Sequence, residues 1–260
     1  MASAGPSGID SISKFPRTKH LFAVGKGVSR DDLLMDKGEE NLFYTDPKTP
    51  DSRVVSIEEK IDGANLGISI AKDYRLLCQN RSHYVTSVTH KQFSPLDSWV
   101  QDHSAELFEI LEPERHILFG EWVYAKHSIH YNQLPSYFIA FDLYDRKERR
   151  FYSRRERNKV LNQTTIPCVP LIQEQPLANQ KDILNLLKAQ QSQYYPGPIE
   201  GVYLRIDEDS PFSNPAKILK LKDSGIHFNS LRGKVVREEF LTGIEEQWTR
   251  QAFTKNVVRF

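Results

Sequence analysis

The 260-residue chain has only two cysteines, Cys78 and Cys168, which stand far apart. No Cys-x-x-Cys pair is present, which argues against structural zinc. So few cysteines also argue against a disulfide scaffold and for a reducing compartment. No apolar run approaches membrane-spanning length, and residues 1–11 are small and polar without a hydrophobic signal region. We therefore expect a flexible start, no membrane partner, and a cytoplasmic or nuclear location.

The chain also lacks an excess of charge of either sign. Its 35 basic residues nearly balance its 34 acidic ones, and the formal net charge is +1. The net charge of the whole chain therefore does not favour a polyanionic partner. A surface that binds nucleic acid, if present, must be a local patch. Apolar residues make up 39% of the chain and aromatic residues 11%, which is enough for a substantial core and typical of an α+β domain.

The apolar pattern predicts strands in the first half of the chain and alternating strands and helices after it. Strands are expected at 53–57, 66–70, 75–79, 117–123, 137–144, 200–205 and 216–222, where apolar or alternating runs are bounded by turn residues. Helices are expected at 97–111, from the N-cap Ser153 to Leu161, at 177–191, and at 237–249.

Lys60 stands between two of the predicted strands and just before Asp62-Gly63. One interpretation is an ordinary surface hairpin, because Asp-Gly is a common turn signal. The other is a nucleophilic amine, which would need neighbouring cations or desolvation to lower its pKa. This short pattern alone does not decide between the two.

Five further short motifs follow in chain order, and each is unremarkable by itself. They are Asn80-Arg81-Ser82, Phe119-Gly120-Glu121-Trp122, the strand 138–144 with Phe141-Asp142, Glu200-Gly201-Val202, and the alternating strand 217–222 with Lys220 and Lys222 on one face. Taken singly, these favour an exposed arginine, an edge carboxylate, a core aromatic ring and a half-exposed strand. The fixed order of the whole set is what favours a functional site.

The segment Glu59-Lys60-Ile61-Asp62-Gly63-Ala64-Asn65 resembles motif I of the covalent nucleotidyltransferases, which include DNA ligases, RNA ligases and mRNA capping guanylyltransferases. Its form is most similar to that of the phage-type, nick-sealing RNA ligases, and the five later motifs match that family's order. The resemblance covers residues 55–223. It implies an α+β, ATP-grasp-like adenylyltransferase domain of antiparallel sheets flanked by helices around a nucleotide cleft.

The resemblance also implies roles for individual residues. Lys60 would form a covalent lysyl-AMP from ATP, Arg81 would contact phosphates, and Phe141 would stack on adenine. Lys220 and Lys222 would stabilise charge on the phosphates and hold down the pKa of Lys60. The carboxylates Glu121, Glu200 and Asp62 would hold Mg²⁺ or Mn²⁺, with Glu121 also able to serve the sugar. Glu59 and Asn65 complete the expected nucleotide-binding set.

The resulting expectation is an ATP-dependent RNA ligase that joins a 3′-hydroxyl to a 5′-phosphate, with a role in RNA repair. Its partner would be nucleic acid with such ends, RNA or an RNA/DNA nick, and its working oligomeric state a monomer. We expect the nucleotidyltransferase domain at 1–225 and a short helical tail at 226–260, with no room for an OB-fold after Lys222.

Other interpretations stay open at this point. They are a minimal DNA ligase, a capping-type guanylyltransferase, and a non-catalytic nucleotide- or RNA-binding module. The role of Asp62 is also open. A basic run from Arg146 to Lys159 is either a solvated face or a track for nucleic-acid phosphates. His127 and His130 form a His-x-x-His pair that suggests a loop contact more than a metal site.

Overall fold

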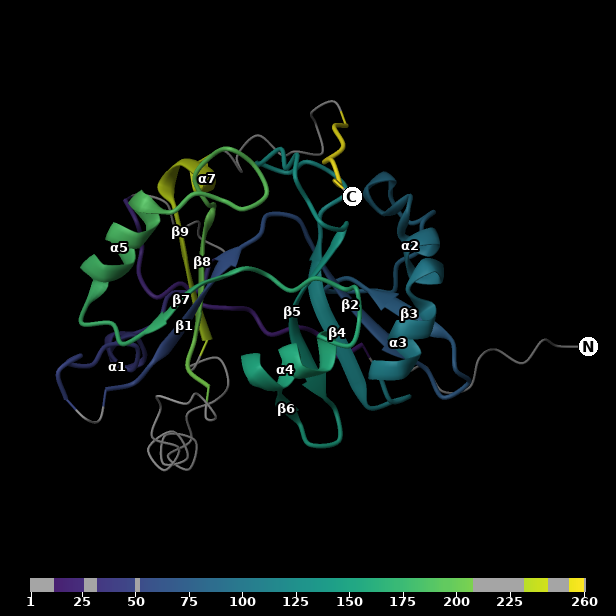
Figure 1. Cartoon of the computed structure of the whole chain (residues 1–260), viewed down its shortest axis with the longest axis horizontal. Coiled ribbons are helices and arrows are strands. Elements are labelled where there is room, and N and C mark those ends of the chain that lie inside the picture. The colour runs from purple at the N-terminus through teal and green to yellow at the C-terminus, as the bar shows by residue number, and fades with distance from the viewer. Residues whose placement is uncertain (1–11, 26–31, 50–51, 208–231, 243–252, 260) are drawn as a thin grey trace, which may run out of the picture.

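The structure is a computed structural model that describes residues 12–25, 32–49, 52–207, 232–242 and 253–259. Its strands form two antiparallel sheets, one of four strands and one of five. The sheets lie next to each other with helices on their outer sides (Figure 1). This confirms the predicted α+β class with antiparallel sheets flanked by helices.

The four-stranded sheet has the order β7-β1-β8-β9. Its strands are β1 (Val55–Lys60), β7 (Leu171–Gln175), β8 (Gly201–Arg205) and β9 (Arg232–Val236). One face is apolar and packs with helix α5 (Gln180–Ala189), through residues that include Ile57, Val202, Leu204, Val235 and Ile183. Because strand residues alternate between faces, the register puts Glu58, Lys60, Tyr203, Arg205 and Lys234 on the other face.

The five-stranded sheet has the order β3-β2-β4-β5-β6. Its strands are β2 (Ala64–Ile70), β3 (Leu76–Gln79), β4 (His116–Trp122), β5 (Phe138–Asp145) and β6 (Arg150–Phe151). Its apolar face packs with α2 (Leu96–Asp102) and α3 (Ser104–Ile110) through Leu66, Ile68, Leu118, Trp99 and Leu107. The single helix predicted at 97–111 is thus two helices, interrupted at His103.

The remaining helices are short. They are α1 (Lys37–Asn41), the 3₁₀ turn η1 (Lys91–Phe93), α4 (Arg154–Leu161) and α7 (Glu238–Thr242). Ser153 caps α4 as predicted, and its hydroxyl accepts a hydrogen bond from the amide of Glu156 at 3.0 Å. The strand predicted at 216–222 and residues 243–249 of the last predicted helix lie outside the described residues. None of the helices in the described ranges is long and apolar enough to cross a membrane.

A buried cluster of charged side chains joins the polar face of the four-stranded sheet to β5 and α4. The Glu58 carboxylate accepts from Arg157 Nη2 at 2.7 Å, and both side chains are fully buried. Arg205 lies 3.1 Å from Asp142 and 3.0 Å from Asp207, which in turn accepts from Arg232 at 2.8 Å. The cluster contains as many buried arginines as buried carboxylates. Buried charges are tolerated when they are paired with opposite charges in this way.

This cluster predicts a specific sensitivity to acid at Asp207. Burial alone would raise the pKa of Asp207, but Arg205 and Arg232 hold it at about 2, below the usual 3.8. The folded state therefore gains stability above the unfolded pKa and loses it as the pH falls through the folded pKa. As the pH falls from about 5 to about 2, protonation of Asp207 should therefore lower the free energy of unfolding by roughly 2 kcal/mol.

The measurement is urea unfolding of the wild type and of Asp207→Asn across that pH range. The variant should be less stable near neutral pH, because two buried arginines lose a carboxylate partner. Its unfolding free energy should fall less steeply toward acid than that of the wild type. Equal slopes for the two proteins would contradict the assigned role of Asp207.

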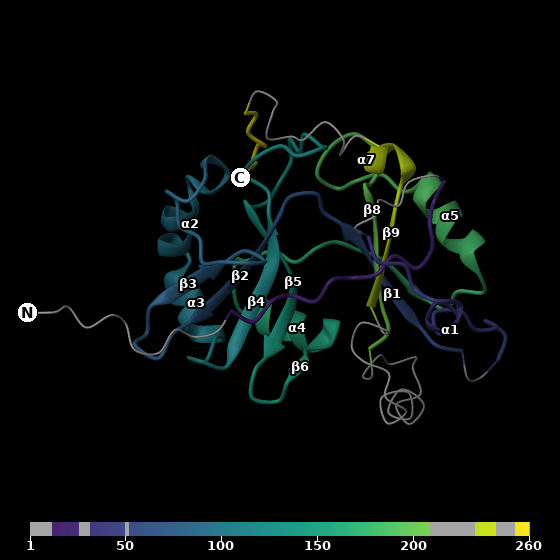
Figure 2. The ribbon, with the colours of Figure 1, turned by 180° about the vertical axis from the view of Figure 1, so that it is seen from behind.

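The segment from residue 12 to residue 25 crosses from one sheet to the other (Figure 2). At the five-stranded sheet, the carbonyl of Ser13 accepts from the Gln79 side chain at 2.9 Å. At the four-stranded sheet, Leu21 N donates to Lys234 O at 3.0 Å, and Lys234 N donates to Lys19 O at 3.0 Å. This N-terminal segment is therefore tied to both sheets and covers the space between them.

Residues predicted to form a separate tail also join the main fold. β9, at 232–236, pairs along β8, and residues 253–259 run along the loop that follows β4. The described part of that second segment is extended, with bridges from Lys255 to Ala125 and from Val258 to Leu134. The described parts of the tail expected at 226–260 thus pair with elements of the expected nucleotidyltransferase domain.

Candidate active site

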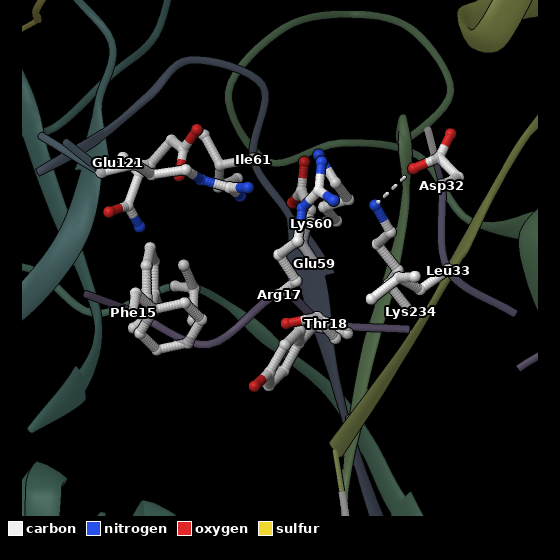
Figure 3. A pocket seen from close by; sticks show the side chains of 15 residues that line it. Phe15, Arg17, Thr18, Asp32, Leu33, Glu59, Lys60, Ile61, Glu121 and Lys234 are labelled. Atoms are coloured by element: carbon white, nitrogen blue, oxygen red, sulfur yellow. Dashed lines mark hydrogen bonds and ion pairs between the residues drawn. The ribbon is translucent and has the colours of Figure 1, made fainter. Parts of the chain in front are cut away.

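Lys60 is the last residue of β1, where the chain leaves the four-stranded sheet to begin β2 in the other sheet. The strand is longer than the predicted 53–57, so Lys60 lies on the strand end and not in a loop. Pairing with Gly201 of β8 fixes its backbone. Its side chain lines a pocket between the two sheets and keeps 26% of its surface exposed there (Figure 3).

Glu200, the residue just before β8, is the ion-pair partner of Lys60. The Lys60 ammonium lies 2.7 Å from both Glu200 carboxylate oxygens. Burial alone would lower the pKa of Lys60, but the negative charges of Glu200, Glu121 and Asp62 raise it above its ordinary value. In this arrangement Lys60 is charged and is not yet a nucleophile. The expected lowering of its pKa by Lys220 and Lys222 concerns residues outside the described ranges.

Glu121 and Asn65 form the wall opposite the four-stranded sheet. They are directly paired neighbours on β4 and β2, and both line the pocket. Burial raises the pKa of Glu121 to about 8, against the effect of Lys60 and with a further contribution from the charge of Glu200. A carboxylate whose pKa is raised in this way, inside a pocket with a second carboxylate nearby, is typical of functional sites.

Phe141 reaches the same pocket because of an irregularity in β5. The register pairs Phe119 with Asp142 and Gly120 with Ala140, so Phe141 is an extra residue in a β-bulge. Its ring lines the pocket and touches the edge of Phe15 from the N-terminal segment, with centroids 5.0 Å apart. Such a bulge re-aims a side chain that would otherwise follow the strand alternation.

Arg81 comes from the turn after β3, and its exposed side chain lines the pocket. Six of the predicted residues therefore share one pocket: Glu59, Lys60, Asn65, Arg81, Glu121 and Phe141. Glu200 joins them through its ion pair with Lys60. These residues come from β1, β2, β4, β5 and the turn after β3, which the fold brings together around Lys60.

Two predicted residues direct their carboxylates elsewhere. Glu59 points to the face of β1 opposite Lys60, where it accepts from the Ser192 hydroxyl at 2.5 Å. Asp62 Oδ2 accepts from the backbone amides of Ser128 at 2.7 Å and Ile129 at 2.9 Å. Asp62 thus holds the loop after β4 against the turn that follows Lys60.

Lys234 is a pocket residue that sequence reasoning missed. It lies on β9, the strand paired with β8, and its ammonium is 3.3 Å from Asp32 (Figure 3). Burial and the nearby charge of Lys60 lower the pKa of Lys234. The available signal was the alternation Arg232-Gly233-Lys234-Val235-Val236, which puts Arg232 and Lys234 on one face.

The N-terminal segment supplies further pocket residues that no motif indicated, namely Phe15, Arg17 and Thr18. Phe15 is buried, and its ring also packs edge-on against Phe119 and Phe151. Nothing in the local sequence marks these residues, because their position depends on the long-range crossing of the segment between the sheets.

The carboxylates around Lys60 fit a divalent cation. Glu121 lines the pocket and Glu200 pairs with Lys60 beside it, so two carboxylates lie near one another at this point. Mg²⁺ and Mn²⁺ prefer such oxygen ligands and complete their shells with water and phosphate. The described residues contain no group of three His, Cys, Asp or Glu arranged for a metal. His130 instead contacts the carbonyl of Lys255 at 3.0 Å, as expected for a loop contact.

The sequence and the fold of this chain were compared with those of known proteins. A family model described as RNA ligase matches residues 53–222. Among solved structures, an RNA ligase mutant from Naegleria gruberi with ATP and Mn gives a TM-score of 0.55 at 15% identity, covering 87% of this chain and 63% of that one. An archaeal ATP-dependent RNA ligase gives 0.50 at 15% identity, covering 88% and 49%.

A putative ATP-dependent DNA ligase from Aquifex aeolicus gives a TM-score of 0.50 at 17% identity, covering 87% of this chain and 50% of that one. At these identities the likeness concerns the fold, and this chain spans between 49% and 63% of the length of the three proteins. A search of curated proteins gave no match. The family match extends over more than half of the sequence and includes every motif from Lys60 to Lys222. The chain therefore belongs to the RNA ligase family.

Proposed function

We propose that this protein is an ATP-dependent RNA ligase that works through a covalent lysyl-AMP on Lys60. The observation that carries the proposal is the position of the Lys60 amine, which lies in a pocket between the sheets beside the carboxylates of Glu200 and Glu121. The family match and the ATP-bound RNA ligase of the same fold support ATP as the nucleotide.

In the first step, Lys60 Nζ attacks the α-phosphorus of ATP. A P–N bond forms, the bond from that phosphorus to the pyrophosphate oxygen breaks, and the amine loses a proton. The ion pair with Glu200 keeps Lys60 in its charged form, so it must loosen before the attack. Lys234 and Arg81 supply positive charge to the phosphates from opposite sides of the pocket. Lys220 and Lys222 stay candidates for the same task.

Glu121 and Glu200 are the residues that would hold Mg²⁺ or Mn²⁺, and Asp62 Oδ1 could contribute through water. Such an ion, when bound, supplies positive charge that favours the neutral amine of Lys60 and stabilises charge on the phosphates. Phe141 offers its ring to the adenine, and Asn65 and Glu59 shape the pocket around the nucleotide.

The second and third steps use the same pocket. An oxygen of the RNA 5′-phosphate attacks the lysyl-AMP phosphorus, the P–N bond breaks, and Lys60 regains its proton. The 3′-hydroxyl oxygen then attacks the 5′-phosphate, AMP leaves, and the strand is sealed. Arg81, on an exposed turn at the pocket, is suited to receive the 5′-phosphate because its guanidinium pairs with phosphate oxygens.

The test is sealing of labelled strands with a 3′-hydroxyl and a 5′-phosphate in ATP and a divalent cation. We expect sealed RNA with ATP and none with GTP, and we expect RNA or RNA/DNA nicks to be sealed faster than DNA nicks. A matched variant is Arg81→Lys. It keeps the positive charge but cannot donate two parallel hydrogen bonds to a phosphate, so it should seal more slowly. Sealing of DNA alone would favour a minimal DNA ligase. A GTP adduct would favour a guanylyltransferase, and no reaction would favour a binding module.

A further inference from the structure

Residues 253–259 hold the turn 61–63, which follows directly after Lys60, through an unbroken chain of hydrogen bonds. Asn256 is its first link. This side chain is 1% exposed, and its Nδ2 donates to the carbonyls of Val123 at 2.8 Å and Ala125 at 3.3 Å. Its Oδ1 accepts from the backbone amide of Tyr131 at 2.9 Å. One amide group thus fastens both ends of the loop 123–131.

Tyr131 is the second link. Its ring is fully buried, and its hydroxyl accepts a hydrogen bond from the backbone amide of Asp62 at 2.9 Å. The same loop presents the amides of Ser128 and Ile129 to the Asp62 carboxylate. Asp62 is therefore held by this loop at both its backbone and its side chain, two residues after Lys60.

Close packing reinforces the hydrogen bonds. Ile61 is buried in one apolar cluster with Val123, Ile129 and Tyr131, and Val258 packs against it. Gly63 leaves no room for a side chain, because an added Cβ would lie 2.7 Å from the carbonyl oxygen of Trp122. The turn 61–63 thus rests directly on the loop that Asn256 fastens, so a shift of that loop must move the turn.

We propose that Asn256 is a positioning residue for adenylylation, acting on Lys60 through Tyr131 and Asp62. The inference rests on the proposed function. The pocket residues Arg81 and Lys234 come from the turn after β3 and from β9, so they should still bind the nucleotide when this chain of contacts is broken. Loss of Asn256 should therefore misplace the amine without weakening ATP binding. Small displacements of a reacting group can cost up to about 100-fold in rate.

The experiment is single-turnover formation of the lysyl-AMP adduct, with rate constant and amplitude measured as functions of ATP concentration. We expect Asn256→Ala to lower the rate constant at saturating ATP by about 10-fold or more, with the ATP dependence unchanged within about 2-fold. Tyr131→Phe removes only a hydroxyl and should lower the same constant in a folded protein. Combined in one chain, the two substitutions should cost less than the product of their separate effects.

Val257→Ala is the matched control, because this neighbour is 45% exposed and its backbone hydrogen bonds are retained; it should react like the wild type. A merely structural role predicts lower amplitude and a lower melting temperature with normal rate constants. Normal rate constants in both Asn256→Ala and Tyr131→Phe would overturn this inference alone. A wild type that forms no adduct would overturn the proposed function itself.

Discussion

Replacing Arg157 with alanine is expected to lower the free energy of unfolding by about 3–5 kcal/mol. Arg157 and Glu58 are both fully buried, and their side chains meet at 2.7 Å. The alanine variant leaves the Glu58 carboxylate with Arg205, at 3.6 Å, as its remaining cation. It also removes one of two donors to the carbonyl of Phe141 and leaves Arg205, at 3.5 Å, so the bulge that aims that ring loses a support. For a protein of ordinary stability, this loss is a large part of the total free energy of unfolding.

The measurement is urea unfolding at neutral pH, with Arg150→Ala as the matched control from the same basic run. Arg150 pairs with Glu156 at 2.8 Å, but the two side chains are 44% and 38% exposed. An exposed pair of this kind contributes at most about 1 kcal/mol. Equal, small losses in both variants would contradict the assignment of Arg157 to the core.

The basic residues of the run 146–159 differ in their exposure, and this difference separates their possible roles. Arg157 is buried and cannot contact nucleic acid, whereas Lys147, Arg149, Arg150, Arg155 and Lys159 are exposed. The phosphate-track interpretation therefore survives only for the exposed members. Their removal should weaken salt-dependent RNA binding.

The sequence predicted the parts of the site that depend on local pattern. Lys60, Glu121 and Glu200 each stand at the end or start of an apolar strand, and strand pairing brings such positions together. Ser153 is predictable as a cap from its residue type at the start of a helix, and its capping partner in the structure, Glu156, is only three residues away. For Ser153, the interaction that fixes the residue lies within a few adjacent positions of the sequence.

The parts that sequence reasoning missed depend on contacts between distant segments. Arg157 looked like one more cation in a basic run, because its partner Glu58 is 99 residues away. Asn256 meets Tyr131 across 125 residues, and Lys234 reaches the pocket only because β9 pairs with β8. No local pattern indicates such pairings.

Replacing Lys60 with arginine is expected to abolish the covalent adduct while leaving the fold intact. Arginine keeps the positive charge that Glu200 pairs with in the pocket. Its guanidinium stays protonated in proteins, so it has no lone pair to attack phosphorus at any practical pH. The variant therefore removes the nucleophile and leaves the electrostatics of the pocket nearly unchanged. The matched control is Lys72→Arg, at an exposed position in the turn after β2, which should form the adduct normally.

The most direct test is intact-protein mass spectrometry after incubation with ATP and Mg²⁺ or Mn²⁺, followed by mapping of the modified peptide. We predict a mass gain of one AMP in the wild type and in Lys72→Arg, located on Lys60, and no gain in Lys60→Arg. The folded state of Lys60→Arg is checked by its unfolding curve. An adduct that persists in Lys60→Arg, or its absence from folded wild-type protein with both metals, would contradict a ligase that works through Lys60.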